Sequence, residues 1–151
     1  MLATGSAIVD AERAFVRAAR ARRRAALARR LRGAPSCGAL LPVYEERAAA
    51  PAGRGLREIP LGAIRGTLEP SRARLFDGAF RPAAAARQRW QRLWLAEHRG
   101  AVLPPISVVP VADGYAVRDG HHRVSVAHAR GALTIDAQVD ATPDRAPPAH
   151  L

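Results

Sequence analysis

A run of polar residues, Asp119-Gly120-His121-His122-Arg123, stands where an apolar-alternating segment gives way to a helix-like pattern that ends at Gly131. The first turn of a helix carries backbone N–H groups with no partner inside the helix, and the aligned peptide dipoles add positive potential there. A glycine lets a ligand approach the backbone closely, and an arginine can donate to two phosphate oxygens at once. We therefore predict a phosphate-binding turn, best suited to a nucleotide, whose ligands are Gly120, His121, His122 and Arg123.

Two roles are open for Asp119. Its carboxylate can cap the N-terminus of the helix, and it can do so while also contacting the ligand. A metal site is not expected, because adjacent helical residues such as His121 and His122 point about 100° apart and no third ligand is obvious. Magnesium that arrives with a nucleotide is a separate case and stays open.

All 24 basic residues of this 151-residue chain are arginine, and with 13 acidic residues they give a net charge of +11. The lack of lysine excludes a Walker-A lysine, a Schiff base and a lysine general base. Cys37 is the only cysteine, so an intrachain disulfide or thiolate metal cluster is excluded, which fits a reducing cytosol. We expect a cytoplasmic protein with no membrane span, since the first residues lack a signal-peptide pattern and the most apolar later segment, 101–112, contains three prolines.

The first element of the chain is predicted to be an arginine-rich helix at 10–32. Asp10 is its predicted N-cap, and Gly33 lies just past its end. Residues 1–33 hold nine arginines and two acidic residues, so a polyanion would be drawn to this part of the chain. The helix should be mostly solvated and only partly docked, because its apolar stripe is thin: Phe15, Ala19, Ala26, Leu27 and Leu31.

Six arginines of this helix have two interpretations. The first is that they neutralise nucleic-acid phosphates or anionic lipid heads; the six are Arg20, Arg22, Arg23, Arg24, Arg29 and Arg30. The second is a basic helix that faces solvent and has no specific partner.

The rest of the chain divides into a linker at 34–55, a domain at 56–140 and a disordered tail at 141–151. Within the domain, alternating apolar residues predict strands at 57–64, 106–111, 115–117 and 134–139. Pro60 suggests that the first strand lies at an edge, and Asp113-Gly114 predicts a hairpin between the second and third.

A helix from Pro82 to Gly100 should bury both Trp90 and Trp94, which lie on its apolar stripe. The segment 66–82 is predicted to be a loop with helical turns, and loops of this length are often functional. Together these elements predict an α+β fold, a small mixed β-sheet with packed helices, preceded by the arginine-rich helix.

A family resemblance becomes visible in the ordered series I-P-L-x-x-I, L-P-P-I-S-V, Y-x-V-x-D-G-H-H-R-V-S-V-A and I-D-A-x-V. It resembles the ParB/sulfiredoxin superfamily, in its ParB N-terminal-domain-like branch, over roughly residues 56–140. In that superfamily the glycine-led motif at the start of a helix holds nucleotide phosphates. The resemblance therefore implies a bound nucleotide triphosphate, CTP or ATP, which can carry magnesium with it.

The departures from that pattern separate the members of the superfamily. Sulfiredoxins have G-C-H-R, and the place of their reactive cysteine is taken here by His121, so their activity is not implied. Partition ParB proteins have a G-E-R-R type motif and a following DNA-reading domain, and neither is present in this sequence. D-G-H-H-R is most similar to the free-serine kinases of the superfamily, which implies that Asp119, and Glu69 as the glutamate of an earlier loop, would serve phosphoryl transfer.

Three functions follow from these observations. The favoured one is a nucleotide-binding ParB-like regulatory module, associated with DNA through the arginine-rich helix. The second is a small-molecule kinase of the serine type, and the third is a basic nucleic-acid-binding adaptor. The sequence leaves the base, the acceptor and the oligomeric state open, and it gives the phosphate turn the strongest physical basis.

Overall fold

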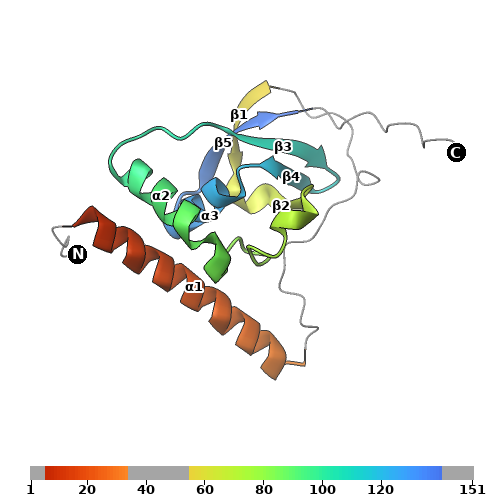
Figure 1. The fold of residues 1–151 in the computed structure, drawn as a ribbon. Helices are drawn as coiled ribbons and strands as arrows, with labels where there is room; N and C mark the ends of the chain where they lie inside the picture. Colours follow the sequence, from red (N-terminus) through yellow and green to blue (C-terminus); the bar gives the residue numbers. More distant parts are fainter. Residues whose placement is uncertain (1–5, 34–54, 141–151) are drawn as a thin grey trace, which may run out of the picture.

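The computed structural model describes residues 6–33 and 55–140, which form a five-stranded mixed sheet with helices stacked on one side (Figure 1). The predicted α+β fold is therefore confirmed. In Figure 1, α3 lies against the sheet, α2 lies next to α3, and α1 is the outermost layer. Most of the predicted linker, with Cys37, and the whole predicted tail lie outside the described residues.

The strand order is β1-β5-β3-β4-β2, so β3 is central. β1 (Gly55–Pro60) pairs antiparallel with β5 (Thr134–Val139), and β5 pairs parallel with β3 (Ile106–Val111). β4 (Gly114–Asp119) then runs antiparallel to β3 and parallel to β2 (Ile64–Thr67). β1 thus lies at an edge, as Pro60 suggested.

The single strand predicted at 57–64 is wrong, because the chain leaves β1 at Pro60 and enters β2 only at Ile64. Between them lies the 3-10 turn η2 (Leu61–Ala63). The contact with β5 ends one residue after Pro60, where the Leu61 N–H donates to the Leu133 carbonyl at 3.0 Å. The chain then crosses to the opposite edge of the sheet. The predicted hairpin is confirmed with a shift of one residue, because Val111 pairs with Gly114 and the turn is Ala112-Asp113.

Two short 3-10 turns, η3 (Pro70–Arg72) and η4 (Ala84–Ala86), precede the helix α2 (Arg87–His98). The α-helix therefore begins five residues later than Pro82 predicts, since residues 84–86 form a 3-10 turn first. α3 (His121–Ala129) begins after Gly120 as predicted.

α1 (Ala7–Leu31) begins earlier than expected, with Ser6 as N-cap, so the prediction of Asp10 as the cap is wrong. Ala7 to Val9 continue the helical geometry, and Asp10 lies in the first turn, where a negative charge favours the helix dipole. Gly33, with φ of 66°, follows the C-cap as predicted. The expected partial docking is confirmed, since Phe15 is buried while Leu27 and Leu31 are exposed.

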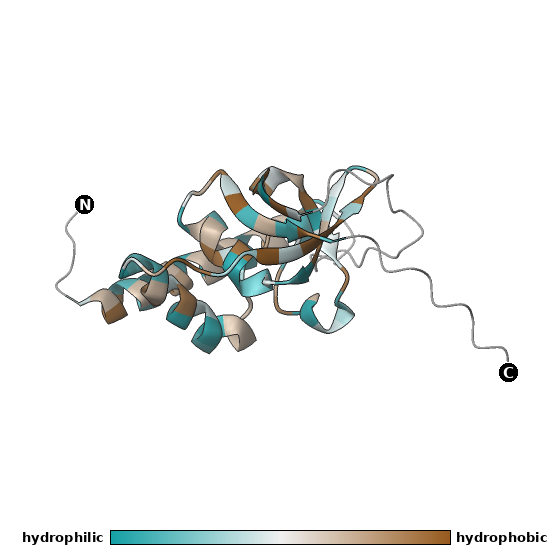
Figure 2. Cartoon of the chain, turned by 90° about the horizontal axis from the view of Figure 1, so that it is seen from above, coloured by the Kyte–Doolittle hydropathy of each residue, from teal (hydrophilic) through white to brown (hydrophobic). Residues whose placement is uncertain are grey.

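Trp90 is the centre of the contact between the helices. Its ring meets Phe15 of α1 edge to face, with centroids 5.5 Å apart, and its Nε1 donates to the Ser125 hydroxyl of α3 at 2.8 Å. Trp90 is fully buried, as predicted, whereas Trp94 is only partly buried and stacks on His98. Figure 2 shows hydrophobic and hydrophilic residues alternating along α1 and along the strands.

Candidate phosphate site at the start of α3

Gly120 joins the end of β4 directly to the first residue of α3. Its φ of 106° and ψ of 22° belong to the left-handed region, which favours glycine. A Cβ at this position would stand 2.5 Å from Cγ2 of Ile106, so a side chain has no room. The local fold therefore requires glycine, and it brings the backbone of the turn directly against β3.

The backbone amides of His121, His122 and Arg123 have no hydrogen-bond acceptor in the part of the chain that the structure describes. No side chain caps α3, and the first amide with a helical partner is that of Val124, which donates to the Gly120 carbonyl at 3.0 Å. Three uncapped N–H groups at the positive end of a helix dipole favour an anion.

The His121 side chain is 3% exposed, and its Nε2 lies 2.6 Å from Oγ1 of Thr67 at the end of β2. The same hydroxyl accepts the backbone N–H of Glu69 at 2.9 Å. The pKa of His121 is lowered to about 4, chiefly by burial and then by Arg72 and His122, with Asp119 acting in the opposite direction. His121 is therefore neutral near pH 7 and fixes the turn to the loop after β2.

The His122 side chain is 7% exposed and packs edge to face on Phe76, with ring centroids 5.1 Å apart. Among the described residues it has no hydrogen-bond partner. Its pKa is lowered to about 4, first by burial and then by Arg89 and Arg72. A neutral imidazole with an unpaired nitrogen can donate to or accept from a ligand.

The positive charge around this turn comes from Arg72 of η3 and Arg89 of α2. Both side chains are exposed, and within the described residues neither forms an ion pair. Both are near enough to lower the pKa of His122, and Arg72 also lowers that of His121. Sequence reasoning missed them, because only the tertiary fold brings η3 and α2 to the start of α3.

Arg123 lies differently from the expectation that its guanidinium is free to grip phosphate. Its Nη1 donates to the carbonyls of Pro104 and Pro105, each at 2.7 Å, and its Nη2 donates to Asp119 at 3.0 Å. The side chain is only 14% exposed. Arg123 thus ties the segment before β3 to the turn, and only its backbone amide belongs to the uncapped row.

The two predicted catalytic carboxylates lie on the surface near this turn. The Asp119 side chain is 72% exposed, pairs with Arg123 and does not cap α3. Glu69 is exposed, and Thr67 links its backbone to His121. Thr67 was also missed, because its role depends on the parallel pairing of β2 with β4, which local patterns do not reveal.

The predicted nucleic-acid residues lie on α1. Arg20, Arg23, Arg24 and Arg30 are exposed, Arg22 and Arg29 are half-buried, and none of the six forms an ion pair within the described ranges. The Nε of Arg22 is buried without a partner among those residues.

Two cavities, of about 330 and 320 Å³, open beside α3, and neither is lined by Gly120, His121 or His122. Gly120, His121 and His122 are themselves buried, so the start of α3 lies outside both cavities with only a small exposed area. Residues 6–33 and 55–140 contain no group of three His, Cys, Asp or Glu side chains placed to hold a metal ion. Among the helices described, none is both long and apolar enough to span a membrane.

No protein-family model and no curated protein matches the sequence. The structure is similar to the crystal structure of sulfiredoxin from Arabidopsis thaliana, with 24% sequence identity and a TM-score of 0.42. The similarity covers 57% of this chain and 84% of the sulfiredoxin chain.

Proposed function

We propose that this chain is a nucleotide-binding regulatory module of the ParB/sulfiredoxin superfamily, with the phosphates of CTP or ATP bound at the start of α3. The observation that carries the proposal is the uncapped row of amides from His121 to Arg123, behind a glycine whose Cβ would not fit. A phosphate group supplies the acceptors that these three donors lack.

The side chains around the uncapped amides of His121 to Arg123 have two roles: some would contact the phosphates, and others position the turn. Arg72 and Arg89 supply the positive charge, and the unpaired His122 imidazole supplies a neutral donor. Arg123 and Thr67 position the turn through their contacts with Pro104, Pro105 and His121. The exposed Asp119 carboxylate would supply an oxygen ligand, of the kind that magnesium prefers, to a magnesium ion carried by a triphosphate.

Isothermal titration with ATP, ADP, CTP and GTP, with and without magnesium, tests this proposal. We expect a triphosphate to bind, and the double change Arg72→Gln and Arg89→Gln to weaken binding about 10- to 100-fold, because charge-assisted contacts are lost. Arg92→Gln, an exposed arginine elsewhere on α2, is the matched control and should keep the affinity. Absence of binding by every nucleotide at millimolar concentration overturns the proposal.

A small-molecule kinase is the second candidate, and the Thr67 link that holds Glu69 beside His121 favours it. In this reaction the γ-phosphoryl group of ATP moves to the hydroxyl oxygen of an acceptor such as serine, the hydroxyl proton passes to Asp119 or Glu69, and ADP leaves. Asp119→Asn and Glu69→Gln should bind ATP normally yet form no phosphorylated product. Nucleotide binding by the unaltered protein without a product from any hydroxyl acceptor leaves only the regulatory module.

DNA binding is the third proposed function, and it is favoured by the exposed arginines along α1 that form no ion pair within the described residues. For duplex DNA, log affinity falls linearly with log salt concentration. Changing four arginines together to glutamine should make this line less steep by about 3 to 4 in slope; the four are Arg20, Arg23, Arg24 and Arg30. Fluorescence anisotropy at several salt concentrations measures this slope. If DNA binds while no nucleotide does, the chain is a basic adaptor; if the slope is unchanged, α1 does not contact the phosphates.

A further inference from the structure

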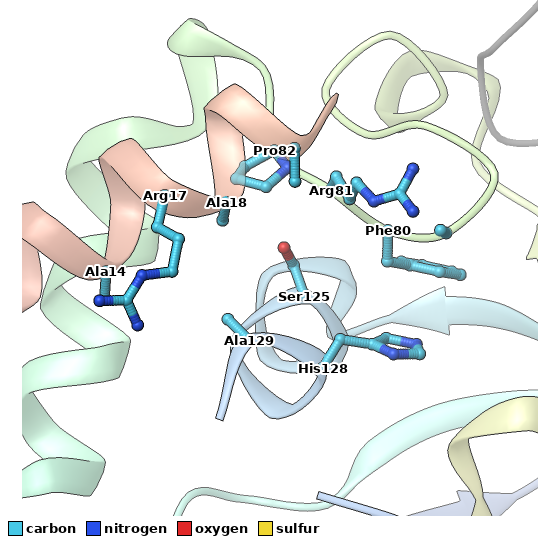
Figure 3. Close-up of a pocket in the computed structure, with 11 residues that line it drawn as sticks. Ala14, Arg17, Ala18, Phe80, Arg81, Pro82, Ser125, His128 and Ala129 are labelled. Atoms are coloured by element: carbon cyan, nitrogen blue, oxygen red, sulfur yellow. The ribbon is translucent and has the colours of Figure 1, made fainter. Parts of the chain in front are cut away.

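A cavity of about 330 Å³ lies between α1, the segment 79–82 and the second half of α3 (Figure 3). It is separate from the phosphate site, because α3 contributes Ser125, His128 and Ala129 here and its first turn there. We propose that this cavity binds a small organic anion with a short apolar body, such as a medium-chain carboxylate. The proposal does not depend on nucleotide binding.

The apolar part of the cavity exists because α1 presents small side chains to it. Ala14 and Ala18 lie one helical turn apart and line the cavity from α1, while Phe80 and Pro82 line it from the segment 79–82. Methyl groups at these positions leave room that longer side chains would fill. A volume near 300 Å³ is at the small end of the range for ligand pockets and suits a body of a few carbon atoms.

Asp77 holds in place the wall of the cavity that residues 79–82 form. The Asp77 carboxylate accepts the backbone N–H groups of Ala79 at 3.0 Å and Arg81 at 2.8 Å, and it pairs with the Arg81 guanidinium at 3.2 Å. Phe80 stands between them with φ of 59°, a conformation that non-glycine residues seldom adopt. His128 stacks on the Phe80 ring, with centroids 6.2 Å apart.

The polar groups around the cavity are suited to a negative ligand. Arg17 and Arg81 line it, and none of its lining residues is acidic. Arg17 has no ion-pair partner in the described part of the chain, whereas Arg81 is already paired with Asp77. Arg17 is therefore the cation that is available to pair with the carboxylate of a ligand.

Ser125 adds a neutral donor at the floor of the cavity. Its hydroxyl oxygen already accepts the Trp90 indole N–H at 2.8 Å, and its own O–H hydrogen has no acceptor among the described residues. Figure 3 shows this hydroxyl directed toward Ala18 and Pro82, across the cavity. A carboxylate oxygen would accept that hydrogen while the apolar body lies against the alanines.

Titration of the full chain with octanoate, followed by calorimetry and by backbone amide NMR shifts, tests the proposal. We expect octanoate to bind at millimolar concentration or below and to shift the amides of Ala18, Ser125 and His128. Octylamine and octanol have the same body without the negative charge, and they should bind at least about tenfold more weakly. Equal binding of all three, or no binding of octanoate, overturns the proposal.

Two variants locate the bound anion. Ala18→Leu should fill the cavity and abolish octanoate binding, and Arg17→Gln should weaken octanoate binding about 5- to 20-fold. Ala26→Leu and Arg13→Gln are controls on α1 outside the cavity. If Ala18→Leu does not fold, the octanoate affinities of Arg17→Gln and Arg13→Gln still test the proposal. An unchanged octanoate affinity in Arg17→Gln would overturn it, because the anion would then bind elsewhere.

Discussion

The imidazole of His121 and the hydroxyl of Thr67 lie 2.6 Å apart, and this contact joins the first turn of α3 to the end of β2. Both side chains are buried, so the contact is shielded from water. Thr67 also holds the backbone of Glu69. One hydroxyl group therefore aligns the turn, the loop after β2 and a predicted catalytic residue.

Thr67→Val should lower the free energy of unfolding by about 1–3 kcal/mol, because the buried His121 nitrogen and the Glu69 amide both lose their partner while the shape is kept. Urea unfolding measures the change. Thr134→Val, an exposed threonine of β5, is the control and should stay within about 0.5 kcal/mol of the unaltered protein. Equal effects of the two changes would show that the Thr67 contact does not stabilise the fold.

Gly120→Ala should cost roughly 2–4 kcal/mol of stability, since it adds a clash with Ile106 to a left-handed backbone. Gly131 has φ of 74° but open space around it, so Gly131→Ala isolates the backbone strain and should cost about 1–2 kcal/mol. Gly78→Ala has neither problem and should change stability by less than about 0.5 kcal/mol. Thermal or urea unfolding of the three variants should give this order, and any other order contradicts the packing of Gly120 on β3.

Arg123→Ala should destabilise the fold by roughly 2–4 kcal/mol, because the carbonyls of Pro104 and Pro105 lose a charged donor. Asp119→Asn removes only the exposed partner of the same guanidinium and should cost less than about 1 kcal/mol. Comparison of their urea midpoints separates the two contacts. Similar losses in both variants would mean that the ion pair, not the link to the prolines, is the main contact.

The stability of the fold should fall as the pH is lowered from about 6.5 toward 4. His121 and His122 have pKa values lowered from 6.5 to about 4 in the folded chain, so in this window the unfolded chain binds more protons. The contribution of the neutral histidines is complete above pH 6.5 and is lost as the pH approaches 4. Urea unfolding at pH 7.5, 6 and 5 measures the decline.

The matched variant for this pH dependence is His122→Gln, which keeps a polar side chain that does not titrate. Its stability should depend less on pH than that of the unaltered protein between pH 5 and 6.5, where few carboxylates titrate. Arg72 and Arg89 face these histidines and keep their charge throughout this range. An unchanged slope in the variant would show that His122 does not contribute to the pH dependence.

Local patterns predicted the elements that are specified by neighbouring residues. The start of α3 at Gly120, the last strand and the glycine after α1 all depend on signals within a few positions, and the structure has each of them. The early start of α1 shows the limit, because Ser6 and Asp10 are both common caps and only the geometry distinguishes them.

The parts of the candidate site that the sequence did not reveal all depend on distant segments. Arg123 was predicted to face a ligand. The sequence does not indicate that its guanidinium donates instead to the carbonyls of Pro104 and Pro105. Likewise, Arg72 and Arg89 reach the turn only through the packing of η3 and α2. The pair Asp119 and Arg123 also depends on the turn, because Asp119 ends β4 and only the left-handed Gly120 brings its carboxylate back to the guanidinium on α3.

The contact between Phe15 and Trp90 also sets an order of assembly during synthesis. Trp90 is made about 75 residues after Phe15, which at ~5–20 residues per second is a delay of several seconds. The arginine-rich helix therefore leaves the ribosome long before the surface that covers its only buried aromatic ring. Docking of Phe15 against Trp90 therefore has to wait until α2 has been made.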